Sequence, residues 1–241
     1  MVEIDDKYKN IQVFVYCGGK CGSKTLYKTL SQYFTTGHFH NQQSFMYHHK
    51  ITDYTLFDII DYNSKIYDNI YIIDSYRTPI ERKISCFFNN IQHYFPNFKN
   101  ISTRELINYF NKQNLIYGAQ EFHPIDEIMN YYNIVPFSNF DFKNKYNICK
   151  KDNIHFIKIR FSDIQNWDKI LQNIFKKKIN IINDNMSITK FYNDKYIHFK
   201  QYYYIPNDYL NIFLKNDINF KIYNTNEEQK EYYKKWKQRL L

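Results

Sequence analysis

The sequence has few of the residues that interrupt regular structure, since its 241 residues include only five glycines and five prolines. No Pro/Ser/Gly-rich hinge or internal repeat divides it. It also lacks any apolar run near the roughly 18 residues that a membrane span needs, and residues 1–10, MVEIDDKYKN, lack the apolar core of a signal peptide. We therefore expect a soluble cytoplasmic protein.

Cysteine is scarce as well, and its spacing does not match the common zinc sites. Cys17 and Cys21 lie close together, but Cys86 and Cys149 are far from them and from each other. A Cys-x-x-x-Cys pair without a second pair or nearby histidines is a poor zinc signature. We expect four reduced thiols and no metal site.

What is abundant indicates a folded, cationic chain. Hydrophobic residues make up 44% and aromatic residues 20% of the sequence, which excludes a disordered chain. The net charge of +9 is compatible with binding to nucleic acid or to anionic small molecules. The excess of Lys, Asn, Ile and Tyr is typical of an AT-rich genome, so surface lysines alone carry little weight.

The few glycines are concentrated in one place. Gly18, Gly19 and Gly22 lie within five positions, between the apolar run 11–16 and a segment with helical spacing that opens at Ser23. Such a concentration predicts a tight turn that comes close to something. A strand, a glycine turn and a helix N-terminus together predict an anion site, most often a phosphate site.

The remaining pattern predicts an α/β fold. Strands and helices alternate, which favours a parallel sheet with crossover helices. We expect one domain over 1–241, with a polar lead-in over 1–10 and a helical C-terminal part from about 185. The predicted strands are 11–16, 36–40, 69–75 and 153–161, and the predicted helices near them are 23–34, 54–62 and 79–91. Capping boxes are predicted at Ser102–Glu105, Ser162–Gln165 and Thr225–Glu228.

The glycine loop has two chemical interpretations. A triphosphate P-loop reads G-x-x-x-x-G-K-[ST], and the segment from Gly18 to Thr25 matches it except that Ser23 stands at the last glycine. The strand that ends at Asp74 also resembles the metal-binding acidic strand of such proteins. The 5′-phosphosulfate loop of sulfotransferases reads lysine, small residue, glycine, Ser/Thr, and residues 20–26, KCGSKTL, fit it without a gap.

A second motif favours the sulfotransferase interpretation. Residues 77–85, RTPIERKIS, resemble the R-x-P-x-x-R-x-x-S segment with which sulfotransferases hold the 3′-phosphate of their cofactor. Arg77 at a strand end and Ser85 two turns into the next helix can converge on one phosphate. A kinase has no need of such a clamp. The plainer alternative is an arginine on a solvated helix face and a serine that caps or packs.

In the order of these motifs the chain resembles the carbohydrate sulfotransferases, and more narrowly the bacterial capsular polysaccharide synthesis proteins, which have a histidine strand H-x-H between the two motifs. Here that strand carries His38 and His40. Looser likeness extends over 123–127, 156–162 and the helix of Trp236. The chain departs from the family pattern at Cys21 and at Lys24.

The resemblance implies a P-loop-like three-layer fold and an enzyme that uses 3′-phosphoadenosine-5′-phosphosulfate, without a metal. It implies transfer of the sulfuryl group in line to an acceptor hydroxyl, with adenosine 3′,5′-bisphosphate as product. A glycan in polysaccharide biosynthesis is the favoured acceptor, and a tyrosine or small-molecule hydroxyl stays open. Lys20 would neutralise the leaving oxygen, Arg77 and Ser85 would hold the 3′-phosphate, and the 5′-phosphate would be bound by Lys20, Cys21, Gly22, Ser23, Lys24 and Thr25.

The resemblance also implies a general base between the two motifs. His40 is the first choice and His38 the second, because a strand end beside the loop places an imidazole of suitable pKa near the sulfuryl group. His48 and His49 are the spare candidates. The other four histidines are expected to be structural: His93, His123, His155 and His198.

Three alternatives stay open. A P-loop kinase or other NTPase would leave Arg77 and Ser85 unexplained, and a non-catalytic nucleic-acid-binding protein would use the charge and the tyrosines. A sulfotransferase fold without activity is the third. In the C-terminal part, Lys195 or Lys200 could belong to a lid over the phosphates, or to an amphipathic helix with a solvated face.

Overall fold

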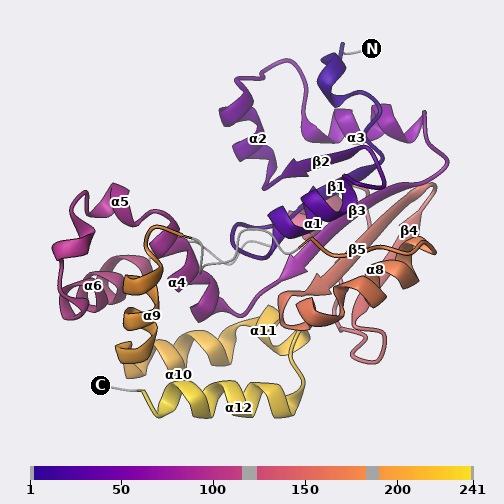
Figure 1. Cartoon of the computed structure of the whole chain (residues 1–241). Coiled ribbons are helices and arrows are strands. Elements are labelled where there is room, and N and C mark those ends of the chain that lie inside the picture. The colour runs from indigo at the N-terminus through magenta and orange to yellow at the C-terminus, as the bar shows by residue number, and fades with distance from the viewer. Residues whose placement is uncertain (1–2, 116–123, 183–189, 240–241) are drawn as a thin grey trace. The chain divides into compact units, whose positions relative to one another are not determined.

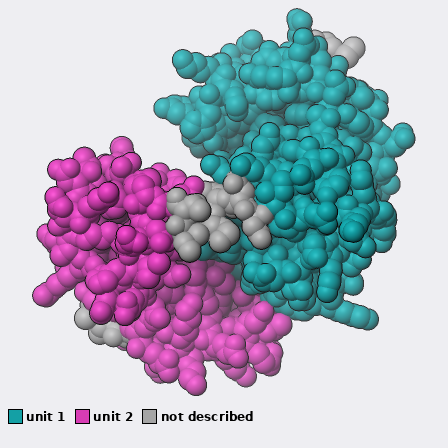
Figure 2. Space-filling view, viewed as in Figure 1, with its two compact units in different colours: residues 1–77, 122–185 teal, residues 78–121, 186–241 magenta. Residues whose placement is uncertain are grey.

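The computed structural model describes residues 3–115, 124–182 and 190–239. The chain forms two compact units: unit 1 comprises Met1–Arg77 and Phe122–Asn185, and unit 2 comprises Thr78–Glu121 and Met186–Leu241 (Figure 2). The chain alternates between these two units, each of which has its own hydrophobic core, and the single domain over 1–241 stays a prediction.

Unit 1 is built on a five-stranded sheet, β2-β1-β3-β5-β4 (Figure 1). Four strands are parallel, and β4 pairs antiparallel with β5 at one edge. The predicted α/β class and central parallel sheet are confirmed, whereas the antiparallel edge strand was not predicted. The bounds are β1 Val13–Tyr16, β2 Thr36–Phe39, β3 Ile70–Tyr76, β4 Tyr146–Lys151 and β5 Ile154–Arg160.

Helices cover both faces of this sheet, because side chains of each strand alternate between two cores. Phe14, Tyr16 and Ile72 face the core of α3 and α7, while Val15 and Ile73 face the core of α1 and α8. The helical segments of unit 1 are η1 Asp6–Tyr8, α1 Ser23–Leu30, α2 Gln42–His49, α3 Leu56–Ser64, α7 Pro124–Tyr131, η4 Phe161–Asn166 and α8 Trp167–Phe175.

The elements of unit 2 in its described residues are helices, joined by short non-helical segments. It contains α4 and the predicted helical C-terminal part, and α4 begins at Pro79 as the sequence predicts. Its segments are α4 Pro79–Asn89, α5 Ile91–Tyr94, η2 Phe98–Asn100, α6 Thr103–Tyr109, the π-helical η3 Phe110–Leu115, α9 Asn193–Tyr202, α10 Asn207–Asn216, α11 Ile218–Ile222 and α12 Asn226–Lys237.

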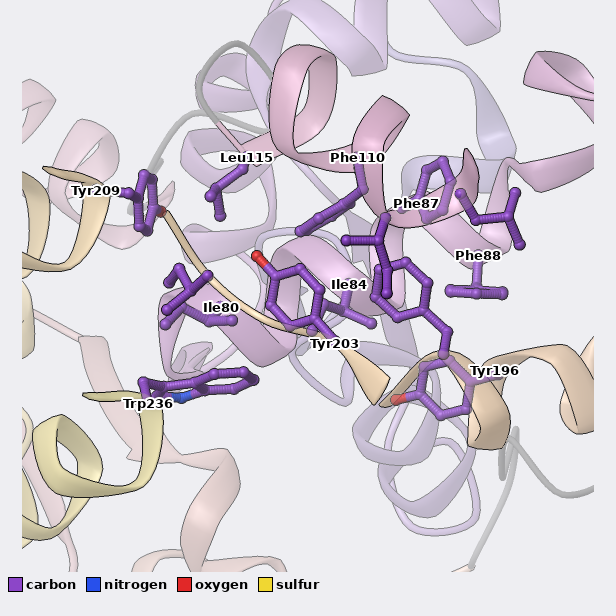
Figure 3. Close-up of a cluster of buried hydrophobic side chains, with 14 of the residues drawn as sticks. Ile80, Ile84, Phe87, Phe88, Phe110, Leu115, Tyr196, Tyr203, Tyr209 and Trp236 are labelled. Atoms are coloured by element: carbon purple, nitrogen blue, oxygen red, sulfur yellow. The ribbon is translucent and has the colours of Figure 1, made fainter. Parts of the chain in front are cut away.

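The core of unit 2 is made largely of aromatic rings. Figure 3 shows Tyr203 among the side chains of α4, η3 and α12, with Phe87 and Phe110 on one side and Trp236 on the other. The ring centroids of Phe110 and Tyr203 are 5.3 Å apart in an edge-to-face arrangement, and those of Tyr203 and Trp236 are 5.6 Å apart. Edge-to-face pairs contribute about 0.5–1.5 kcal/mol each beyond their burial, so aromatic packing stabilises this unit without a sheet.

Two of the three predicted capping boxes are confirmed, at Ser102 with Glu105 and at Thr225 with Glu228. The box at Ser162 is wrong, because residues 161–166 form the 3₁₀ segment η4 and the α-helix begins only at Trp167. Asp163 in this segment accepts a hydrogen bond from Arg160 Nε at 2.7 Å, which stabilises a conformation other than an α-helical first turn.

The cysteines are free thiols, as the sequence predicts, and both Cys17 and Cys21 are buried. Among the residues that the structure describes, no helix is long and apolar enough to cross a membrane.

Candidate functional site

The glycine-containing loop joins the end of β1 to α1 at the carboxyl edge of the parallel strands. It runs from Cys17 to Gly22, and α1 opens at Ser23. Lys20 and Gly22 both have left-handed backbones, with φ of 68° and 85°. In a non-glycine residue this conformation stores about 1–3 kcal/mol and is concentrated at binding sites. The turn therefore has the strained, helix-capping geometry that suits a bound anion.

Glycine is required at position 22 because a side chain there would clash with neighbouring rings and strain the backbone. A Cβ built on it would lie 2.7 Å from the Trp167 ring and 3.0 Å from the Phe161 ring, in addition to the strain of φ +85°. Gly22 is also the N-cap of α1 and provides no side-chain cap. The first N–H groups of a helix have no carbonyl partner within it, so an anion bound in the loop could accept hydrogen bonds from this end of α1.

Arg77 lies against this loop. Its Nη1 donates a hydrogen bond to the Lys20 carbonyl oxygen at 2.8 Å, and its guanidinium carbon lies 4.5 Å from the centre of the Phe161 ring. Arg77 follows directly after β3, as predicted, and is half-buried. A guanidinium has five N–H donors, so a fixed positive charge with donors to spare borders the predicted anion loop.

The second partner of the predicted clamp belongs to unit 2. Ser85 lies in the second turn of α4 and is half-buried. Arg77 is the last residue of the first segment of unit 1. The structure thus brings Arg77 to the loop, while the pairing of Arg77 with Ser85 stays a prediction.

His40 is hydrogen-bonded to the first residue of the loop. Its Nδ1 lies 2.8 Å from the Cys17 carbonyl oxygen, and the side chain is otherwise exposed. A carbonyl oxygen only accepts hydrogen bonds, so Nδ1 carries the proton and Nε2 of the neutral ring carries the lone pair. This is the tautomer that a general base at Nε2 requires.

His38 has a different environment, although it shares a face with His40 as predicted and Phe39 between them is buried. Its ring stacks on Tyr27 at 5.5 Å and meets the His40 ring edge-on at 4.9 Å. Burial, helped by the charges of His40 and Lys24, lowers the pKa of His38 to about 4. A neutral, weakly basic ring is better suited to packing beside His40 than to acting as the general base.

The other candidate side chains are held by contacts elsewhere. His49 packs on Phe45 at 5.3 Å, on α2, which also carries His48. His155 is bonded to Asn69 and His198 to Thr103, at 2.8 Å and 2.7 Å, which agrees with structural roles. The two lysines considered for a lid have contacts of their own. Lys195 Nζ donates a hydrogen bond to the Ile101 carbonyl at 2.7 Å, and Lys200 Nζ lies 5.0 Å from the centre of the Tyr196 ring. His123 lies outside the described residues.

A buried ion pair beside the loop was not predicted. Lys158 Nζ donates to Asp74 Oδ2 at 2.5 Å, and both side chains are 1% exposed. They are direct neighbours in the register of β3 and β5. The only signal in the sequence was a lysine and an aspartate within apolar strands, and their partnership depends on strand register. Asp74, which the kinase interpretation needs for a metal, is thus already paired with an ammonium group.

On the same face, α7 adds two carboxylates. Tyr16 donates to Glu127 Oε2 at 2.7 Å, and burial together with Glu127 raises the pKa of the Tyr16 phenol. Burial also raises the pKa of Asp126, against the opposing charge of Lys158. Among the residues described, no group of three or more His, Cys, Asp and Glu side chains is placed to hold a metal ion.

Taken together, unit 1 places a strained glycine loop, a guanidinium and an oriented imidazole at one edge of a parallel sheet. Searches against protein-family models, curated proteins and solved structures found no match for this chain.

Proposed function

We propose that the protein is a sulfotransferase that uses 3′-phosphoadenosine-5′-phosphosulfate and modifies an acceptor hydroxyl, with a carbohydrate as the favoured acceptor class. The observation that carries the proposal is the contact of Arg77 with the carbonyl of Lys20. It joins the 20–26 loop to Arg77, the first residue of the 77–85 segment, within unit 1.

The residues present fit a bisphosphate cofactor. The loop backbone at Lys20 and Gly22 is left-handed, and the end of α1 behind it lacks a side-chain cap. Such a turn offers N–H donors to the 5′-phosphate, with the hydroxyls of Ser23 and Thr25 beside them. Arg77 supplies a charged fork for a second phosphate, with Ser85 as the proposed partner. When bound, the cofactor supplies an activated sulfuryl group.

Two side chains would carry the chemistry. His40 Nε2 would take the proton of the acceptor hydroxyl, because its Nδ1 proton is directed to Cys17. Lys20 would stabilise the charge that develops on the leaving phosphate oxygen, a contact that strengthens in the transition state. His38 would hold the Tyr27 and His40 rings in place rather than move a proton.

The kinase interpretation is the second candidate, and the structure disfavours it at one residue. Asp74 would have to leave Lys158 and lose a buried ion pair in order to bind a metal, and breaking such a pair costs about 3–5 kcal/mol.

The direct test is transfer of label from ³⁵S-labelled phosphosulfate cofactor to a panel of glycans, tyrosine peptides and small phenols. Label in a glycan supports the full proposal, and label in another acceptor supports the reaction but corrects the acceptor class. No transfer to any acceptor, by a protein that also fails to bind the bisphosphate product, would overturn it.

A further inference from the structure

Unit 2 contains a hollow of about 840 Å³ that the proposed reaction does not use. It lies between α10, α11 and α12, which are side by side in gold and yellow in Figure 1. Leu214, Phe220 and Tyr233 provide its apolar lining. Its volume is within the roughly 300–1,000 Å³ of small-molecule sites.

The side chains of α12 that line the hollow lie on one face of this helix. Tyr232 and Trp236 of this helix are buried in the core of unit 2. Lys230, Tyr233, Lys234 and Lys237 recur at i, i+3, i+4 and i+7, which places them on one face. This face lines the hollow, and Lys221 of α11 lines it as well.

The charged side chains among the described residues that line the hollow are all positive. They are the lysines Lys221, Lys230, Lys234 and Lys237, and among the described residues that line it none is acidic. Gln229 is held in place by hydrogen bonds from its Nε2 to the carbonyls of Lys221 and Asn224, at 3.2 Å and 2.8 Å. Lysine stems can pack along apolar surface while their ammonium groups stay in water, so the hollow offers an apolar floor beneath a cationic rim.

Other anionic partners fit this hollow less well. Insertion into a membrane surface needs an apolar helix face that is exposed, but Tyr232 and Trp236 of α12 are 9% and 3% exposed. Nucleic acid needs several exposed ring faces on which successive bases can stack, but of the two rings that line the hollow only Tyr233 is more than 9% exposed, and Phe220 is 4% exposed.

We propose that this hollow binds a monomeric amphiphile with one hydrocarbon chain and a phosphate head. The chain packs on the half-buried Tyr233 and the stems of the lysines, over the small exposed parts of Leu214 and Phe220. The phosphate is bound by Lys230 and Lys234 with Lys221 and Lys237 near it. The hydrocarbon removed from water supplies affinity, and the lysines select the anionic head. This proposal is independent of the sulfotransferase reaction.

The test is titration calorimetry of the full chain with dodecyl phosphate, kept below its micelle concentration. Dodecyl phosphate should bind saturably at one site, and decyl phosphate should bind several-fold more weakly because each methylene group contributes to burial. Dodecyl phosphocholine and inorganic phosphate should each bind at least tenfold more weakly. Equal binding of the phosphocholine, or binding of phosphate alone with the same affinity, would overturn the proposal.

The matched variants carry equal charge changes within unit 2. Lys230→Gln with Lys234→Gln should weaken dodecyl phosphate binding by about tenfold or more, whereas Lys99→Gln with Lys112→Gln, at exposed lysines outside the hollow, should stay within twofold of the parent. Thermal melting of both variants checks that they fold. Unchanged binding by the first variant would contradict the site. A dimer mass for the unliganded protein in light scattering, lost in the first variant, would show instead that a second copy covers the hollow.

Discussion

His40 and Cys17 are joined by a hydrogen bond of 2.8 Å between the imidazole Nδ1 and the backbone carbonyl. The bond connects the residue after β2 to the first residue after β1, so the imidazole moves with the loop. It also fixes which nitrogen is the base, because the carbonyl only accepts. The base and the anion loop of the proposed enzyme are therefore parts of one local structure.

Replacing His40 by alanine should lower sulfuryl transfer by about 10²-fold or more, because a positioned base contributes this much. Affinity for adenosine 3′,5′-bisphosphate should stay within a few-fold of the parent, since Nε2 contacts the acceptor and not the phosphates. The transfer assay and calorimetry measure the two effects. His48→Ala, at an exposed histidine of α2, is the control. Full activity of His40→Ala with loss in His38→Ala, His48→Ala or His49→Ala would identify another base.

Replacing Lys20 by alanine should separate turnover from binding. Its ammonium group interacts most strongly as the leaving oxygen gains charge, so kcat should fall more than bisphosphate affinity does. Steady-state kinetics and equilibrium titration of the same preparation provide the comparison. An equal loss in both quantities would mean that Lys20 serves only ground-state binding.

Gly22→Ala should destabilise unit 1 by about 2 kcal/mol or more and abolish bisphosphate binding. The added Cβ would meet the Trp167 ring at 2.7 Å at a φ of +85°, and both the clash and the left-handed strain oppose folding. Gly19→Ala is the matched control in the same loop, because nothing lies within 4 Å of its Cβ position. Urea unfolding measures the free energy of unfolding of both variants. Equal stability of Gly22→Ala and Gly19→Ala would show that the loop does not pack on Trp167.

His38 should make stability depend on pH. Burial lowers its pKa to about 4 in the folded protein from 6.5, so between these values the unfolded chain binds more protons than the folded one. The contribution of the neutral His38 to the free energy of unfolding is fully present above pH 6.5. It is lost as pH falls toward 4, by up to about 3 kcal/mol. Unfolding free energies at pH 7, 5.5 and 4.5 should fall less steeply for His38→Asn than for the parent. Parallel curves would show that His38 is not buried as described.

The sequence predicts the parts of the fold that depend on local pattern. The apolar run before Gly18, the alternation around Phe39 and the proline at the start of α4 each indicated their element correctly, because periodicity and backbone restriction act within a few residues. Among the elements that were not predicted are α2 and β4, whose sequences, QQSFMYHH and YNICKK, have neither a clear apolar face nor a continuous apolar run.

The candidate site was predictable only where motif residues are adjacent in sequence. The loop and the position of Arg77 after β3 follow from local spacing, but the stacking of Arg77 on Phe161 brings together residues that are far apart in the chain. The pairing of Asp74 with Lys158 likewise requires the register of two strands. The weak basicity of His38 arises from burial against Tyr27, which a spacing argument does not reveal.

We propose that the loop and Arg77 form a site for a 3′,5′-bisphosphate, and ligand-induced thermal stabilisation is the most direct test of this site. Adenosine 3′,5′-bisphosphate should raise the melting temperature of the protein more than ATP with magnesium does, since only the former has a phosphate for the proposed clamp. The shift should be largely lost in Arg77→Ala, which removes a charge-assisted fork. Equal or greater stabilisation by ATP with magnesium, or an undiminished shift in Arg77→Ala, would contradict a bisphosphate site at the loop and Arg77.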